Sequence, residues 1–233
     1  MPEPRLILAI DTCGPSGSVA LGRFTGTAFE LLGQIELKGR TYSATLVSAV
    51  GELVQPAGAE VQALAGIVVV NGPGSFTGVR VGVSAAKGLA FGAGIPVLAV
   101  SRLEVLAAKA QIPLAALDAH RGEVFLRIER PGRGPEEILA GPGELAALLP
   151  RSERVAVCDE AATILAAAWP ETQLVSTTPP LASDALRVAA PRLFAGERVD
   201  LALLDGHYLR RSDAEIFGRD VIAQHSAAGT KGA

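Results

Sequence analysis

Leu6-Ile7-Leu8-Ala9-Ile10 is an apolar run of strand length, and the stretch after it, Asp11-Thr12-Cys13-Gly14-Pro15-Ser16-Gly17, is rich in turn-forming residues. Residues 18–22 (Ser-Val-Ala-Leu-Gly) predict a second strand, so we expect the chain to open with a β-hairpin. The same order recurs at residues 114–129, where an apolar run ends at Asp118, a tight turn follows and a strand returns. This repeat predicts two lobes of similar topology.

The region between the two hairpins alternates between strand and helix patterns. Residues 66–70 (Gly-Ile-Val-Val-Val) are apolar at every position, which is typical of a strand covered on both faces. A glycine-rich turn at residues 72–78 leads into a predicted helix at 77–91, and residues 96–100 predict the next strand. Such alternation predicts an α/β protein with mixed sheets flanked by helices.

A duplicated lobe that opens on an apolar strand, an aspartate, a turn and a second strand is the general plan of the actin-like ATPase (ASKHA) fold. We expect an N-terminal lobe at residues 1–103 and a C-terminal lobe at 104–225, whose last segment returns to the first lobe. Residues 226–233 are small and polar and predict a disordered tail.

Composition excludes several classes of function. Of the 233 residues, 49% are hydrophobic and 19% are charged, so the chain has enough apolar side chains for a core. The formal net charge of −3 lacks the basic excess typical of a chain that binds nucleic acid alone. The most apolar stretch, residues 79–100, is interrupted by Arg80, Lys87 and Pro96, and the first apolar run is too short for a signal peptide. We expect a cytoplasmic protein with no membrane span.

Two glycine-rich turns are candidate phosphate contacts. Asp11 and Thr12 stand at a strand end, where a carboxylate suits Mg²⁺ and turn amides suit phosphate oxygens. Gly74 and Ser75 precede a helix, whose N-terminus can hold an anion. The alternative is that the aspartate caps its own turn and the serine caps the helix. These residues alone leave open whether the chain binds ATP-Mg, as an actin-like ATPase or small-molecule kinase would, or uses them only to shape the turn and cap the helix.

The helix at residues 77–91 contains many small side chains. Gly78 and Gly82 are four residues apart, and an interior glycine costs about 1 kcal/mol relative to alanine. Close approach of a second helix would offset that cost, and the second helix would belong either to residues 41–54 of this chain or to another protein. The candidate interface residues on these two helices are Leu46, Val50, Leu53, Gly78, Val79, Gly82, Ala86 and Ala90.

Four blocks of sequence, taken together, resemble the TsaB (YeaZ) family of bacterial accessory subunits. They are residues 7–12 (Ile-Leu-Ala-Ile-Asp-Thr), 71–90 (starting Asn-Gly-Pro-Gly-Ser-Phe-Thr-Gly-Val-Arg), 118–125 (Asp-Ala-His-Arg-Gly-Glu-Val-Phe) and 208–210 (Tyr-Leu-Arg). The resemblance implies the actin-like fold and a role in forming threonylcarbamoyladenosine at adenosine 37 of tRNAs that read codons beginning with A. It also implies TsaD, the catalytic paralogue, and TsaE, a small ATPase, as partners, with tRNA reached through the complex.

The resemblance further implies that this chain is not itself the catalyst. The catalytic paralogue carries a His-x-x-x-His metal pair where this chain has Arg102 and Leu106, and neither side chain has a lone pair to give a metal. We therefore expect a scaffold subunit with no catalytic or metal-binding residue and no tightly bound cofactor, which pairs with TsaD through the two helices. ATP-Mg at a subunit junction and a homodimer of the isolated chain are further expectations. Tyr42-Ser43 departs from the His-Ser common in the family.

Overall fold

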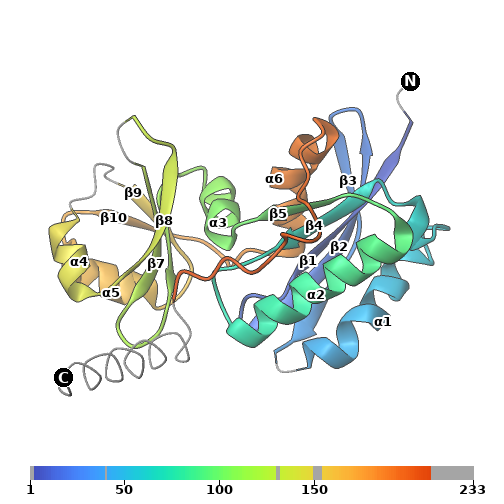
Figure 1. The fold of residues 1–233 in the computed structure, drawn as a ribbon. Coiled ribbons are helices and arrows are strands. Elements are labelled where there is room, and N and C mark those ends of the chain that lie inside the picture. Colours follow the sequence, from blue (N-terminus) through green and yellow to red (C-terminus); the bar gives the residue numbers. More distant parts are fainter. Residues whose placement is uncertain (1–2, 40, 130–131, 149–153, 211–233) are drawn as a thin grey trace, which may run out of the picture.

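A computed structural model describes residues 3–39, 41–129, 132–148 and 154–210 (Figure 1). The predicted tail at 226–233 lies outside these residues. The strands are β1 (Arg5–Asp11), β2 (Ser16–Thr25), β3 (Ala28–Lys38), β4 (Gly66–Val70), β5 (Val97–Val100), β6 (Ala115–Asp118), β7 (Val124–Glu129), β8 (Pro135–Ala140), β9 (Arg154–Val157) and β10 (Gln173–Ser176). The helices are α1 (Tyr42–Val54), the 3-10 turn η1 (Val61–Ala63), α2 (Phe76–Ala93), α3 (Arg102–Ala110), α4 (Pro142–Ala147), α5 (Ala161–Ala168) and α6 (Ala182–Phe194).

The strands form two five-stranded sheets with the same internal order. The first runs β3-β2-β1-β4-β5 and the second, read in the matching direction, runs β8-β7-β6-β9-β10. Each opens with an antiparallel hairpin whose first strand ends on an aspartate, because Asp11 pairs with Ser18 and Asp118 pairs with Val124. The predicted α/β fold of two similar lobes with mixed sheets is confirmed.

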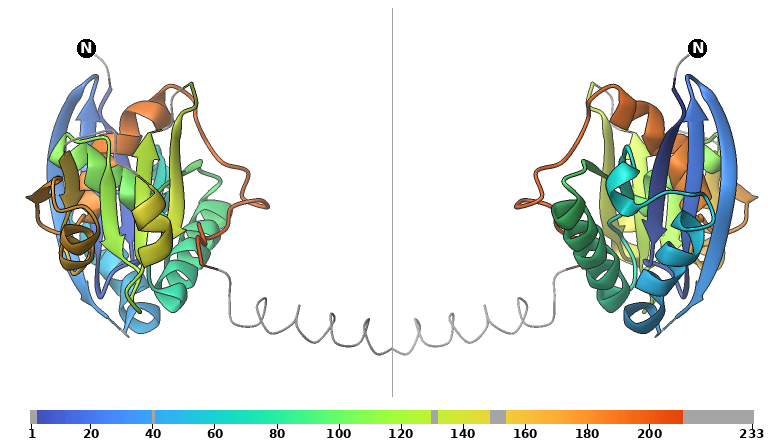
Figure 2. Two further views of the ribbon diagram at one scale, coloured as in Figure 1. Left: turned by 90° about the vertical axis from the view of Figure 1, so that its left-hand side faces the viewer. Right: turned by 90° about the vertical axis from the view of Figure 1, so that its right-hand side faces the viewer.

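Helices cover both faces of the first sheet, which explains why every residue of β4 is buried. The Cβ position of Gly22 on β2 lies against Leu186 of α6, whereas that of Gly33 on β3 lies against Leu53 of α1. Because Gly33 pairs with Leu21, the neighbour of Gly22, the two glycines point to opposite faces. Thus α6 covers one face, and α1, with α2 packed beside it, covers the other (Figure 2).

The last helix of each lobe packs on the other lobe. Helix α3 follows β5 of the first sheet, yet Leu103 and Leu106 lie in a core with β6 and β7. Helix α6 follows β10 of the second sheet, yet Leu186 and Leu193 lie in the core of the first lobe. The expected boundary at residues 103 and 104 therefore falls inside α3, whose Val105 lies in the core of the first lobe.

After α6 the chain runs back along the first lobe as an extended segment, residues 195–210, which we call the strap (Figure 1). Val199 N donates to Val97 O of β5, and His207 N donates to Asn71 O just after β4. Farther along, Arg210 contacts Ala119 O and Glu123 in the β6–β7 turn of the second lobe. The strap therefore spans both lobes.

The second lobe contains two strands that the sequence pattern does not indicate. Strand β8 is an edge strand with Pro135 and two glutamates, and β10 is short and half-exposed. Such strands lack the apolar run that marks a buried strand. Among the described residues, no helix has both the length and the apolar content needed to cross a membrane.

Candidate functional site

The four predicted phosphate contacts, Asp11, Thr12, Gly74 and Ser75, lie together in the first lobe, where contacts with Cys13 and Gly78 hold them. Asp11 Oδ1 accepts a hydrogen bond from Cys13 N at 2.9 Å, which closes the turn. Thr12 Oγ1 donates to Gly78 O at 2.6 Å, and Ser75 N donates to Cys13 O at 2.8 Å. This network joins the β1–β2 turn to the start of α2.

The glycines at the start of α2 make room for this turn. A Cβ at Gly78 would overlap the backbone oxygen of Thr12, and a Cβ at Gly82 would overlap Thr12 Oγ1. Of the two expected second helices, a helix of another protein is wrong for these two glycines, whereas the chain's own α1 does come close, since a Cβ at Gly78 would lie 3.3 Å from Tyr42 Cε2. Both glycines admit the chain's own β1–β2 turn, and the close contact offsets the cost of glycine in a helix.

Arg102 fills the space beside Asp11. Arg102 is only 6% exposed, and its Nε lies 3.9 Å from Asp11 Oδ2. This nitrogen has no hydrogen-bond partner among the described residues. Burial raises the pKa of Asp11, an effect that the guanidinium of Arg102 opposes. The positive charge that faces this carboxylate is thus supplied by the chain itself. Among the described residues, no group of three His, Cys, Asp or Glu side chains is arranged to hold a metal.

The strap covers one side of the glycine-rich turn. A Cβ at Gly72 would lie 2.9 Å from His207 O, and Gly72 and Pro73 are both buried. Gly74 and Ser75 remain exposed, and Ser75 Oγ accepts a hydrogen bond from Gly78 N at 3.3 Å as the N-cap of α2. The glycine-rich turn at residues 72–78 is therefore open to a ligand only at residues 74–77.

The other predicted interface residues lie mostly inside the first lobe. Leu46, Val50, Val79, Ala86 and Ala90 are each no more than 2% exposed and belong to its core. A fully buried side chain cannot touch a partner, so these residues are not contact residues, and that part of the expectation is wrong. Leu53, the remaining one, is half-buried beside Gly33. The periodicity correctly marked the buried faces of the helices, which pack on their own sheet.

The surface of these helices nevertheless carries unusual apolar exposure. Six large hydrophobic side chains are exposed in the described residues, and five of them lie on α1, α2 and the strap, which pack side by side. We call these five the apolar face: Val47 of α1, Phe76 and Phe91 of α2, and Leu203 and Tyr208 of the strap. Phe91 is 84% exposed and Leu203 is 81% exposed. Large apolar side chains exposed on neighbouring elements are typical of an interaction surface.

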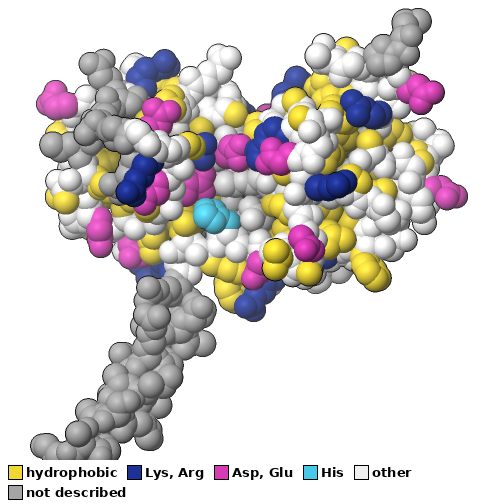
Figure 3. All heavy atoms as spheres, turned by 45° about the horizontal axis from the view of Figure 1, so that its top comes forward, with side chains coloured by type: hydrophobic (Ala, Val, Ile, Leu, Met, Phe, Trp, Pro, Cys, Tyr) yellow, Lys and Arg dark blue, Asp and Glu magenta, His cyan; other side chains and the backbone are white. Residues whose placement is uncertain are grey.

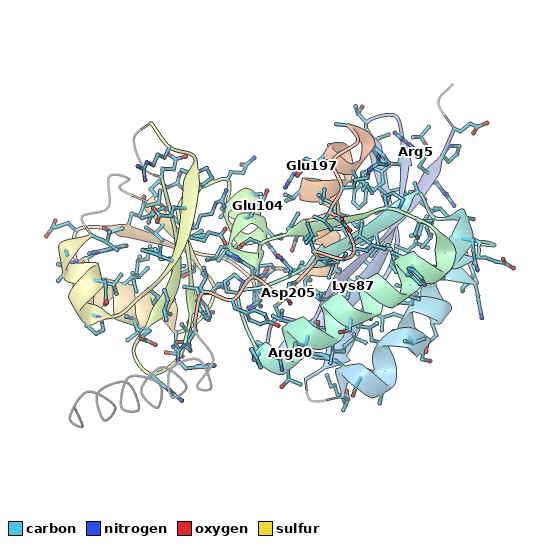
Figure 4. All side chains as sticks on the ribbon, viewed as in Figure 1. Arg5, Arg80, Lys87, Glu104, Glu197 and Asp205 are labelled. Carbon is cyan, nitrogen blue, oxygen red and sulfur yellow. The ribbon has the colours of Figure 1, made fainter. Side chains whose placement is uncertain are left out.

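Local contacts hold the strap part of the apolar face in place. The rings of Phe76 and Tyr208 have centroids 5.1 Å apart, and Arg80 Cζ lies 3.8 Å from the Phe76 ring centroid. Lys87 Nζ donates to Leu204 O at 3.0 Å, which fastens the strap to the middle of α2. Figure 4 labels Arg80 and Lys87 along α2 and Asp205 on the strap beside it. This aromatic corner was not predicted, because it joins residues more than a hundred positions apart.

Three further glycines lie on the outward side of the two helices. A Cβ at Gly51 of α1, or at Gly88 or Gly92 of α2, would meet nothing within 4 Å. Within the part of the chain that the structure describes, no contact explains these glycines, in contrast to Gly78 and Gly82. They leave the helix backbones open to close approach from outside.

Comparisons with known proteins agree with the sequence motifs. Residues 35–132 match the family model described as TsaD, tRNA N6-adenosine threonylcarbamoyltransferase. The chain is 39% identical over 123 residues to the tRNA threonylcarbamoyladenosine biosynthesis protein TsaB of Bacillus subtilis, covering 51% of this chain and 52% of that protein. It is 38% identical over 125 residues to TsaB of Escherichia coli, covering 51% and 52%. The chain thus spans about half the length of the curated relatives it matches.

Solved structures extend the likeness to most of the chain. YeaZ from Pseudomonas aeruginosa superimposes with a TM-score of 0.70 at 27% identity, over 88% of this chain and all (100%) of that one. A second Pseudomonas aeruginosa structure, described as similar to peptidase YEAZ, gives a TM-score of 0.72 at the same 27% identity and coverage of 88% and 100%.

Proposed function

We propose that this chain, which is similar to the TsaB and YeaZ proteins, is a non-catalytic scaffold subunit in the formation of threonylcarbamoyladenosine at adenosine 37 of tRNA. It pairs with a TsaD-type transferase through the apolar face, joins TsaE in the same assembly, reaches tRNA only through that assembly and works in the cytoplasm. The observation that carries the proposal is the gathering of five of the six exposed large apolar side chains on α1, α2 and the strap.

The chemistry of the buried side chains supports a scaffold rather than a catalyst. Arg102 and Leu106 are 6% and 0% exposed, and the first is committed to the buried carboxylate of Asp11. Neither can donate a lone pair. The transferase chemistry therefore belongs to the partner.

The exposed glycines support a helix-to-helix contact. Gly51, Gly88 and Gly92 let a partner helix approach the backbones of α1 and α2, while Val47 and Phe91 supply apolar side chains beside them. Because related subunits present similar surfaces, the isolated chain forms a two-fold homodimer through the same face. The partner displaces one copy when it is present.

We also propose that ATP-Mg binds only where this chain meets a second subunit. The chain holds no tightly bound cofactor of its own, since strap residues cover Gly72 and Arg102 faces Asp11. Gly74 and Ser75 remain exposed at the N-terminus of α2, and they contact ATP-Mg only where a second subunit completes a junction.

Pairing tests the proposal directly. We would mix the purified chain with TsaD and follow complex formation by size-exclusion chromatography with light scattering, using the variants Val47→Glu and Phe91→Glu. A carboxylate at the centre of an apolar interface should weaken pairing about tenfold or more. Leu31→Glu is the matched control, because Leu31 is the one exposed large apolar side chain of the described residues outside this face. Wild-type pairing by both face variants, or an equal loss in the control, would refute the assignment.

The rival function is an actin-like ATPase or small-molecule kinase. It requires Asp11 to hold Mg²⁺, whereas Asp11 Oδ1 is occupied by Cys13 N and the carboxylate faces Arg102. Calorimetry of the isolated chain with ATP-Mg discriminates between the two. Tight binding that Asp11→Ala abolishes would favour the rival.

A further inference from the structure

Glu137 of β8 is a buried carboxylate on which three separate segments converge. Its side chain is 8% exposed. Ser101 Oγ donates to its Oε2 at 2.5 Å, His207 Nε2 lies 2.9 Å from the same oxygen, and Arg127 Nη1 donates to its Oε1 at 2.8 Å. Hydrogen bonds to a buried charge are among the strongest that a side chain makes.

The donors come from both lobes. Arg127 belongs to β7, in the same sheet as Glu137. Ser101 follows β5 of the first sheet and caps α3 by accepting from Leu103 N at 3.1 Å. His207 belongs to the strap. Thus one carboxylate of the second lobe holds both the connection that leaves the first lobe after β5 and the strap that runs along the first lobe to the second.

The strap passes from Glu137 directly to the aromatic corner of the apolar face. His207 N donates to Asn71 O at 2.6 Å, and the next residue, Tyr208, stacks beside Phe76. A Cβ at Gly206 would lie 2.6 Å from Val79, so the strap lies tightly on α2 here. The position of His207 therefore determines where Tyr208 can lie.

Other ion pairs also tie the lobes, and they differ in burial: Arg102–Asp11 has side chains 8% and 3% exposed, and Lys109–Asp184 has side chains 18% and 21% exposed. The Arg192–Glu104 pair has side chains 35% and 28% exposed, and the Arg210–Glu123 pair 28% and 33%. Ion pairs open to solvent contribute little, whereas breaking a buried one is costly. Charged side chains of both signs gather in the hollow between the lobes (Figure 3). Glu137 differs from these ties because it is a buried carboxylate that also holds the strap, through His207, whose side chain is 37% exposed.

We propose that Glu137 couples the second lobe to the partner-binding surface, because it holds His207 and thereby positions the Tyr208–Phe76 pair. We call the contacts of Glu137 with Ser101, Arg127 and His207 the clasp. The hydrogen-bond partners of Glu137 are Ser101, Arg127 and His207, none of which belongs to the apolar face, so Glu137 acts as a positioning residue. The clasp itself is a property of the isolated chain. Its effect on pairing rests on the function proposed above.

Hydrogen exchange of the isolated full chain tests the clasp. Glu137→Gln keeps the shape of the side chain but removes its charge. The amides of Val199, Leu204 and His207, which are all hydrogen-bonded, should exchange about tenfold faster or more, while amides of β1 and β4 keep their wild-type rates. Glu129→Gln is the control, because Glu129 is an exposed carboxylate on β7, the strand paired with β8.

A second variant keeps the test valid if Glu137→Gln does not fold. His207→Ala removes only the strap's contact and leaves Ser101 and Arg127 on the carboxylate, so it should accelerate exchange in the strap alone. Unchanged strap amides in either folded variant would overturn the clasp, as would equal acceleration in the strap and β1.

Pairing with TsaD tests the coupling separately. Both variants should pair about fivefold more weakly or worse, although neither changes the apolar face. Faster hydrogen exchange of the strap amides together with wild-type affinity for TsaD would overturn the proposed coupling. If the wild-type chain itself ignores TsaD, the proposed function fails, while the exchange data still decide whether the clasp exists.

Discussion

The two kinds of glycine in α2 predict opposite effects of the same substitution. At Gly88 a Cβ would meet nothing within 4 Å, so Gly88→Ala should stabilise the folded chain by about 1 kcal/mol through helix propensity. At Gly82 a Cβ would overlap Thr12 Oγ1, which already donates to Gly78 O at 2.6 Å. Gly82→Ala gains the same propensity but forces the β1–β2 turn away from the helix.

The magnitudes follow from these contacts. Overpacking a dense core costs about 1–3 kcal/mol, and loss of the Thr12 hydrogen bond costs about 1 kcal/mol more. After the propensity gain, Gly82→Ala should be about 1–3 kcal/mol less stable than wild type, which places it about 2–4 kcal/mol below Gly88→Ala. Urea unfolding followed by circular dichroism measures the difference as a shift in midpoint. Equal midpoints for the two variants would refute the assignment of Gly82 to an internal contact. The larger Gly82→Leu should prevent folding rather than merely block pairing.

Three further predictions concern buried ionisable groups. Arg102→Met should destabilise the chain by about 3 kcal/mol at pH 7, because it leaves the Asp11 carboxylate buried without a countercharge. Since burial raises the pKa of Asp11, this loss of stability should shrink as the pH falls toward 4. Urea unfolding at each pH measures it. Burial raises the pKa of Glu137, but hydrogen bonds from His207, Ser101 and Arg127 outweigh burial and leave the pKa below 4.5. The contribution of this carboxylate to stability should therefore be present above pH 4.5 and lost as the pH falls below it. Glu137→Gln should flatten the dependence of the unfolding free energy on pH in that range. Burial raises the pKa of Cys158 to about 11, so iodoacetamide should alkylate it far more slowly at pH 8 than a free thiol, and rapid labelling would contradict its environment.

The repeated hairpin could be predicted from sequence because its signal is local. An apolar strand, an aspartate and a turn recur at residues 6–17 and 114–122, and both hairpins form as expected. Strand β8 could not be predicted in the same way, since Glu136 and Glu137 interrupt the apolar pattern and the contacts of Glu137 come from distant segments. The packing of α3 and α6 on each other's lobes could not be predicted from sequence either, because an apolar helix face does not specify which sheet it covers.

The candidate site shows the same limit more sharply. Small residues at Gly78 and Gly82 indicate a close approach but not by what, and the contact proves to be Thr12 of the same chain. Phe91 and Leu203, the most exposed apolar residues, carry no sequence signal, because a single apolar residue in a helix or loop is common on protein surfaces. Only the fold reveals that they share a surface.

The duplication supplies an internal control for the apolar face. By chain order, α4 and α5 occupy in the second lobe the places of α1 and α2 in the first. Helix α5 has 8 residues against the 18 of α2, and none of the exposed large apolar side chains in the described residues lies on α4 or α5. If the architecture itself required such exposure, both lobes would show it. The apolar face is therefore a property of α1, α2 and the strap, and a partner that recognises it has a reason to bind one lobe and not the other.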